Sequence, residues 1–247
     1  MDIIHRQEVR LSMLPDEKLR RAFKAAFPYT IPIFAGFVFL GIAYGVYMKA
    51  SGFPAIYPLL MSLLIFAGSM EFVAVNLLLG AFDPLGAFVL TLMVNARHLF
   101  YGISMLDKYS NIGWKRWYLM FGLCDESFSI NCTADVAPDV DRGWFYFFVT
   151  LLNHSYWVCG AALGGLFGAL LSFNTKGIEF VMTALLVVIF LEQWMKEKDH
   201  TSGLLGLFLS LLCLAAFRGN FIIPSMIAIL GALTLLRKRL DGEEGRR

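Results

Sequence analysis

The hydrophobic positions of this chain form runs that are long enough to cross a lipid bilayer, which takes about 20 apolar residues in a helix. Short polar stretches separate these runs, which cover residues 28–48, 58–80, 84–106, 144–171, 178–195, 203–217 and 220–236. Residues 116–134 form a further run, but its acidic and hydroxyl side chains make it marginal by hydropathy. The pattern predicts an all-α protein, a polytopic transmembrane helix bundle of about seven or eight membrane segments.

Composition agrees with this class. Of the 247 residues, 58% are hydrophobic and 16% are charged, and the mean hydropathy is +0.65. Such a chain is too apolar for one soluble core. The basic segment 1–24 has no continuous apolar core of the signal-peptide type, so we expect it to remain in the cytoplasm. Residues 25–236 are then the transmembrane domain, and residues 237–247 form a charged C-terminal tail.

The lysines and arginines indicate the orientation, because they accumulate on the cytoplasmic side of membrane proteins. If all eight runs cross and the N-terminus is inside, 14 of these residues lie inside and six lie outside, Arg97 excluded. If residues 116–134 do not cross, the count becomes eight inside and 12 outside. The distribution favours eight crossings with both termini in the cytoplasm. The short connection at 218–220 leaves one re-entrant segment as an alternative.

Glycines recur at every fourth position in two of the runs. Gly41 and Gly45 form a pair, and Gly160, Gly164 and Gly168 form a triplet. This spacing lets the backbones of two helices approach closely. We interpret both stripes as packing surfaces and not as ligand sites.

The run at 84–106 contains three strongly polar side chains, Asn95, Arg97 and His98. Arg97 lies 13 residues after the start of the run, which places it about 20 Å into a hydrocarbon core roughly 30 Å thick. A charge at that depth costs about 2.5 to 3.5 kcal/mol on insertion scales and is normally paired. We therefore expect a functional role for Arg97, and we consider a broken or re-entrant helix near residues 95–102.

Polar residues also interrupt the run at 58–80, where Gly68 precedes Ser69 and Glu71. Discontinuous membrane helices often present their free backbone groups and dipole ends to a binding site. We expect a broken or re-entrant helix near residues 67–72. The alternative is one continuous helix whose Glu71 bonds to Arg97.

A polar stripe follows the marginal run at helical spacing. It comprises Gly122, Asp125, Ser129 and Cys132, with Glu126 beside it. Such a stripe at membrane depth indicates a water-filled cavity. Asn153 and His154, in the middle of the run at 144–171, are candidates to face the same cavity. An intramembrane histidine is as often satisfied by a neighbouring carbonyl, so both interpretations of His154 stay open.

Three motifs in a fixed order give the chain a family resemblance. They are Phe66–Phe72, Asn95–Gly102 and Phe121–Phe128. Together with the order of the segments over about residues 23–236, they resemble the AzlC family, the large permease subunits of bacterial branched-chain amino acid exporters. The resemblance implies a multi-pass protein of the bacterial inner (plasma) membrane that works with a small membrane subunit of the AzlD type. Glu71 departs from the family pattern, in which glutamine is more usual.

The residues and the resemblance together predict a secondary transporter that exports leucine, isoleucine, valine or methionine, with no preference among them. The candidate substrate-binding or coupling residues are Gly68, Ser69, Glu71, Asn95, Arg97, His98, Tyr101, Asp125, Glu126 and Ser129, with Asn153 and His154 as secondary candidates. Four flanking aromatic residues are candidates for an apolar wall, namely Phe72, Phe100, Tyr101 and Phe128. Membrane lipid is the expected surrounding, and we expect no cofactor, metal or nucleic acid.

Two other functions remain as alternatives. One is an intramembrane enzyme that uses His98 or His154 with a carboxylate as an acid–base pair, although the chain has none of the common catalytic motifs. The other is a scaffold subunit that does not transport. The deep charges argue against a scaffold, because charges in a membrane segment usually mark a functional site.

Charge counting adds two expectations. Arg97 should pair with Glu71 or Asp125, because an unpaired deep charge is unstable. Glu71, Asp125 and Glu126 bring three acidic groups against one fixed positive charge. Burial and mutual repulsion disfavour the ionisation of all three. At least one of them should hold a proton in some state, and we expect this group to be Asp125 or Glu126.

Overall fold

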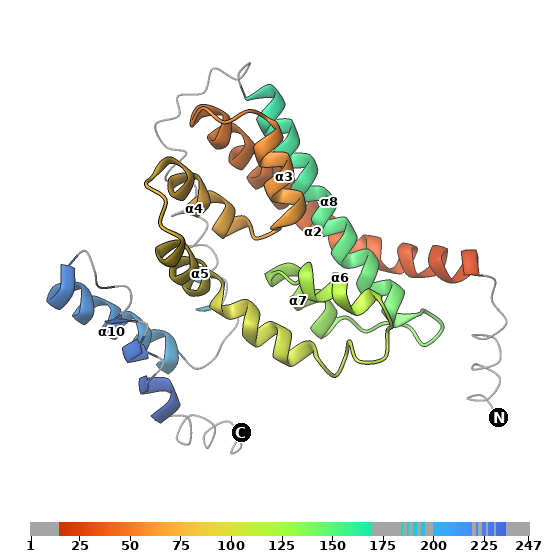
Figure 1. The fold of residues 1–247 in the computed structure, drawn as a ribbon. Helices are drawn as coiled ribbons and strands as arrows, with labels where there is room; N and C mark the ends of the chain where they lie inside the picture. The colour runs from red at the N-terminus through yellow and green to blue at the C-terminus, as the bar shows by residue number, and fades with distance from the viewer. Residues whose placement is uncertain are drawn as a thin grey trace. The chain divides into compact units, whose positions relative to one another are not determined.

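The computed structural model describes residues 15–168 without a gap and, further along, residues 200–218 and scattered positions between 184 and 235. The chain divides into two compact units, Met1–Met182 and Thr183–Arg247, which are described separately. The first unit contains α2 (Pro15–Ala50), α3 (Ile56–Leu64), α4 (Gly68–Leu79), α5 (Pro84–Met105), α6 (Lys115–Phe121), α7 (Asp125–Thr133) and α8 (Arg142–Phe167), and the second contains α10 (Thr201–Phe217) (Figure 1). No described residue lies in a β-strand, so the predicted all-α class is confirmed.

Helix length and apolarity identify one membrane-spanning candidate among the described residues, the stretch Asp16–Ala50 of α2. The expected total of seven or eight segments therefore stays a prediction. Three of the expected parts lie wholly or mostly outside the described residues, and the run at 220–236 is described only in part. The three are residues 1–14 of the N-terminal segment, the run at 178–195 and the tail at 237–247.

The long helix α2 has 36 residues. It begins at Pro15, a residue that is tolerated in a first turn, and Asp16 and Glu17 follow at the positive end of the helix dipole. Residues 15–24, which we assigned to the cytoplasmic segment, are thus continuous in one helix with the first apolar run.

The apolar run at 58–80 consists of two short helices, α3 and α4, separated at residues 65–67. Phe66 has a φ of +47°, in the left-handed region that a bulky side chain rarely adopts, and Ala67 is also outside helical geometry. The predicted interruption is therefore present, and it begins slightly before residues 67–72. The alternative of one continuous helix is wrong.

The marginal run at 116–134 is also two helices, α6 and α7, separated at residues 122–124. Gly122 ends α6, whereas Asp125 begins α7. The predicted stripe is therefore wrong in one respect, because Gly122 does not share a helix with the other members. Ser129 and Cys132 remain on the same helix as Asp125.

By contrast, α5 is one uninterrupted helix of 22 residues, so the broken helix considered near 95–102 is wrong. Asp83 caps its start by accepting a hydrogen bond from the Gly86 N–H at 2.9 Å, and Pro84 occupies the first turn. The deep charge does not require a break, because Arg97 finds an acidic partner on a neighbouring helix.

The helices α2 and α8 pack side by side (Figure 1). A Cβ added to Gly41 would lie 2.9 Å from a carbonyl oxygen of α8, and one added to Gly160 would lie 2.7 Å from a carbonyl oxygen of α2. Gly45 and Gly164 approach the opposite backbone even more closely. The interpretation of the glycine stripes as packing surfaces is confirmed.

Side chains of α8 contribute to both hydrophobic cores of the first unit. Val149 belongs to a core that includes Leu119 and Leu123, next to the break between α6 and α7. Further along α8, Trp157 belongs to a second core with Phe72 of α4, next to the break between α3 and α4. Both breaks are therefore supported by the same helix.

Candidate functional site

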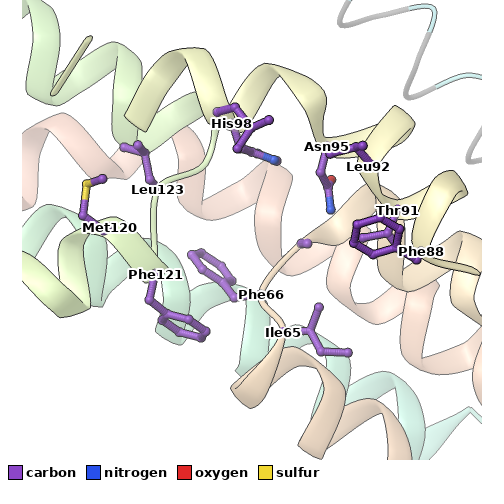
Figure 2. A pocket seen from close by; sticks show the side chains of 12 residues that line it. Ile65, Phe66, Phe88, Thr91, Leu92, Asn95, His98, Met120, Phe121 and Leu123 are labelled. Atoms are coloured by element: carbon purple, nitrogen blue, oxygen red, sulfur yellow. The ribbon is translucent and has the colours of Figure 1, made fainter. Parts of the chain in front are cut away.

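A cavity of about 350 Å³ lies where the two helix breaks approach the middle of α5 (Figure 2). Its wall comes from the break between α3 and α4, from α5, and from the end of α6 with the break that follows. The lining residues are Ile65, Phe66, Ala67, Phe88, Thr91, Leu92, Asn95, His98, Leu99, Met120, Phe121 and Leu123. Small-molecule pockets usually span about 300 to 1,000 Å³, so this cavity suits a small ligand.

The polar edge of the cavity follows one face of α5 and consists of Thr91, Asn95 and His98. Figure 2 shows Asn95 and His98 across the cavity from Phe66 and Phe121. The Thr91 hydroxyl donates to the α5 backbone at 2.7 Å and is satisfied. The Asn95 Oδ1 atom is buried and accepts no hydrogen bond from the described residues. Asn95 thus lines the cavity beside apolar walls, while its buried Oδ1 atom lacks a partner among the described residues.

Arg97 and Asp125 form an ion pair beside this cavity, with 3.0 Å between Nη2 and Oδ2. Each side chain is 25% exposed, and neither lines the cavity. One helical turn along α5, the ring of Tyr101 stacks on Phe128 of α7 at 4.4 Å between centroids. The expected pairing of Arg97 is thus present with Asp125 and not with Glu71. These contacts fasten α5 to α7.

Glu71 lies in the first turn of α4 and is fully buried. Its Oε1 atom accepts hydrogen bonds from the Ala67 backbone N–H at 3.1 Å and from Trp157 Nε1 at 3.0 Å. Its Oε2 atom is buried and has no hydrogen-bond partner among the described residues. Because Ala67 lines the cavity, one hydrogen bond connects the cavity wall to this carboxyl group.

His154 on α8 connects the two broken segments. Its Nε2 lies 3.2 Å from the Ser62 carbonyl oxygen of α3, and its Nδ1 lies 3.0 Å from the Tyr118 hydroxyl of α6. A carbonyl only accepts, so Nε2 carries a proton, and neutral Nδ1 accepts from Tyr118. The ring also packs against Phe66 and Phe121 of the cavity wall. Of the two open interpretations, His154 is a carbonyl-satisfied histidine.

The other predicted site residues lie around the cavity without lining it. Gly68 and Ser69 open α4, directly after Ala67, and Ser69 is buried. Glu126 and Ser129 are partly exposed on α7. Asn153 donates to the Ser127 hydroxyl at 3.2 Å and thereby ties α8 to α7.

The predicted apolar wall is wrong, because none of its four aromatic residues lines the cavity. Phe72 is in the core, and Phe100 is 61% exposed. The wall is built from residues of the two breaks, from the middle of α5 and from the end of α6. Sequence reasoning also missed Trp157. Its position four residues after Asn153 was the available signal, because that spacing places both residues on one face of a helix.

Comparison with known proteins decides the family. Residues 32–171, more than half of the chain, match the AzlC protein family. The chain belongs to the AzlC family. The resemblance drawn from the three motifs is therefore confirmed.

Relatives of this AzlC member cover most of its length. The branched-chain amino acid transport protein AzlC of Bacillus subtilis is 69% identical over 224 residues, 90% of this chain and 88% of the relative. An uncharacterized membrane protein of Haemophilus influenzae is 54% identical over 225 residues, 90% of this chain and 92% of the relative. The inner membrane protein YgaZ of Escherichia coli is 27% identical over 194 residues, 72% and 76% of the two chains. No solved structure matches. This AzlC member is a membrane protein.

Proposed function

We propose that this AzlC member is a secondary transporter that exports branched-chain amino acids. The observation that carries the proposal is the cavity at the junction of two broken helices, with apolar walls and a polar edge on α5. Discontinuous helices are a common way to build transporter binding sites. The name of the B. subtilis relative, a branched-chain amino acid transport protein, supports the same substrate class.

The cavity has separate places for the parts of such a substrate. The branched side chain contacts Phe66, Phe121 and their apolar neighbours, and the Asn95 side chain turns its unpartnered Oδ1 toward the cavity to accept a hydrogen bond from the ammonium group. The substrate carboxylate faces His98 and the first turn of α4, which starts right after the lining residue Ala67. Helix N-termini attract anions through their free N–H groups and dipole.

The enzyme alternative has less support. Among the described residues, no histidine nitrogen lies within 4.0 Å of a carboxylate oxygen, whereas an acid–base pair requires hydrogen-bond contact. Both ring nitrogens of His154 are occupied by Ser62 and Tyr118. A transport role agrees better with this arrangement.

Efflux of radiolabelled leucine or valine from preloaded cells tests the proposal. Cells that express the protein together with a small membrane subunit of the AzlD type should export faster than cells that express the small subunit alone. Asn95→Leu should lower the rate by about tenfold or more, because it leaves the ammonium group without its acceptor. Asn76→Leu is the matched control, since Asn76 is exposed near the end of α4 and does not line the cavity. Equal export by the two folded variants would contradict the assignment of the cavity.

The proposal includes a partner, a small membrane subunit of the AzlD type, which follows from the family resemblance. Purified protein in liposomes should therefore transport only when the small subunit is added. Full transport by this chain alone would exclude the requirement.

The proposal also includes a multi-pass arrangement in the bacterial inner membrane with both termini in the cytoplasm, as the distribution of lysine and arginine favours. Single cysteines placed in the two terminal segments should react with a membrane-impermeant reagent only after the cells are opened. Labelling of the C-terminal cysteine in intact cells would indicate an odd number of crossings.

A further inference from the structure

The buried carboxyl group of Glu71 has an asymmetric environment. Its Oε1 atom accepts two hydrogen bonds, from Ala67 N and Trp157 Nε1, and its Oε2 atom receives none from the described residues. A backbone N–H and an indole N–H can only donate. Oε1 is therefore fixed as the accepting oxygen, and a proton on this carboxyl group can reside only on Oε2.

No positive charge compensates Glu71 within the described part of the chain. No lysine, arginine or histidine nitrogen there lies within 4.0 Å of its carboxyl oxygens. Arg97, the deep arginine of α5, is engaged with Asp125. An ionised carboxylate that is fully buried without a cation is strongly disfavoured, whereas a protonated one needs no countercharge.

The helices packed around Glu71 offer no other group that would take over this role. On α2, the Tyr44 hydroxyl donates to the Met61 sulfur at 3.3 Å. On α8, His154 is held by Ser62 and Tyr118. Glu71 is the single acidic or basic residue of α3 and α4. On α5, Arg97 is paired, and His98 faces the cavity.

We propose that Glu71 is the proton-binding group that couples transport to a proton gradient, an inference that rests on the proposed function. In the conformation described, the carboxyl group holds its proton on Oε2. Release gives a carboxylate and a proton in water, and uptake from the other side of the membrane restores the acid. This role replaces the expectation from charge counting, which favoured Asp125 or Glu126.

The geometry also indicates how the protonation of Glu71 affects the substrate cavity. Ala67 lines the cavity and donates its N–H to Glu71, and it lies in the break between α3 and α4. A buried carboxylate needs water or a cation, so loss of the proton requires the break to open toward water. An opening there moves the cavity wall. The protonation state of Glu71 and the shape of the substrate cavity are thus linked by one residue.

Leucine transport in membrane vesicles from cells that express the full protein together with the small AzlD-type subunit tests the coupling. Wild-type vesicles should exchange leucine at equal pH on both sides and accumulate it under an imposed pH gradient. Glu71→Gln keeps the accepting oxygen but holds no exchangeable acidic proton. It should retain exchange, which needs only one protonation state, and lose gradient-driven accumulation. Glu17→Gln, an exposed control on α2, should retain both.

Infrared spectroscopy of the purified full-length protein tests the proton without transport. Near neutral pH, the spectrum of the wild type minus that of Glu71→Gln should contain the carbonyl stretch of a protonated carboxyl group, sensitive to heavy water. The spectrum of the wild type minus that of Glu17→Gln should lack this band. If Glu71→Gln does not fold, Trp157→Phe serves instead. It removes one donor to Oε1, which favours the acid, so the band should persist to higher pH.

The outcomes separate the two proposals. Wild-type vesicles that contain the small subunit and neither exchange nor accumulate leucine would end the proposed function, while the infrared band would still test whether Glu71 holds a proton. A Glu71→Gln protein that exchanges and still follows the pH gradient would overturn the role of Glu71 alone. Absence of the carboxyl band, with no response to Trp157→Phe, would overturn the proton on Oε2.

Discussion

The two broken helices each place an acidic residue in the first turn after the break but compensate it differently. Glu71 and Asp125 each lie in the first turn of the helix that follows the break, where the helix dipole favours a negative charge. Asp125 is 25% exposed and pairs with Arg97. Glu71 is fully buried and has two N–H donors but no cation within the described residues.

This difference separates two roles that a helix break can have. The ion pair at the second break holds α5 and α7 together, and its charges balance in one state. The carboxyl group at the first break can change its charge only by gaining or losing a proton. We expect the second break to keep one conformation during transport. The first break should change conformation when Glu71 gains or loses its proton.

Removal of the cation at the second break should have the largest effect. Arg97→Ala leaves Asp125 without its countercharge, which costs about 3 to 5 kcal/mol for a fully buried pair and less here, because each side chain is 25% exposed. Thermal unfolding and gel filtration of the purified protein should show lower stability and yield. Asp125→Asn in the same chain should recover part of the loss. If Glu71→Gln restored the loss and Asp125→Asn did not, Arg97 would compensate the charge of Glu71 at the first break.

Steric fit at the second break gives the next prediction. A Cβ added to Gly122 would collide with the Cγ2 methyl group of Thr150 on α8. Gly122→Ala should therefore destabilise by about 1 to 3 kcal/mol, as overpacking usually does. Thr150→Ser removes that methyl group, so the double variant should unfold at a higher temperature than Gly122→Ala alone. If it does not, α8 does not support the second break as described.

The histidine that joins the two breaks should show coupled effects of a similar or smaller size. His154→Phe leaves the Ser62 carbonyl without its donor, at a cost of about 1 to 3 kcal/mol. Tyr118→Phe removes one hydrogen bond, worth about 0.5 to 1.5 kcal/mol. Because Tyr118 bonds to His154, the double variant should lose less than the sum of the single losses in denaturant unfolding. Additive losses would contradict a shared connection.

An exposed acidic residue far from both breaks should show the smallest effect. Glu17 pairs with Arg21 at 2.6 Å, with side chains 48% and 41% exposed. Glu17→Gln should change stability by about 0 to 1 kcal/mol, and added salt should abolish the difference. A larger loss that persists in salt would show that neutralisation of any acidic residue destabilises the protein. Effects of substitutions at Glu71 or Asp125 could then not be assigned to the two breaks.

The sequence predicted the existence of the first break better than the details of either break. Gly68 and Glu71 in an apolar run indicated an interruption, and the polar residues of 116–134 marked that run as unusual. The positions of the breaks could not be predicted, because an apolar run has the same hydrophobic pattern whether it forms one helix or two. Those positions depend on contacts with Trp157 and His154 of α8, which are distant in the sequence.

The partners of the deep charges were also beyond the sequence. Hydropathy and depth predicted that Arg97 needs a carboxylate, but spacing along the chain could not choose between Glu71 and Asp125. That choice depends on which carboxylate the fold brings within reach of the Arg97 guanidinium, and this is Asp125 of α7. The substrate cavity had the same limitation. Asn95 and His98 were identified by their polarity, whereas the apolar wall includes Phe66 of the first break and Phe121 at the end of α6, which nothing local distinguishes from core residues.

The glycine contact between α2 and α8 has a consequence for biosynthesis. About 90 residues lie between the end of α2 at Ala50 and the start of α8 at Arg142. At a synthesis rate of about 5 to 20 residues per second, the glycine face of α2 waits roughly 5 to 20 s for its partner. During that interval both breaks lack the helix that supports them. A nascent chain that stalls before residue 142 therefore cannot complete its packing, and we expect it to depend on membrane insertion factors or to be degraded.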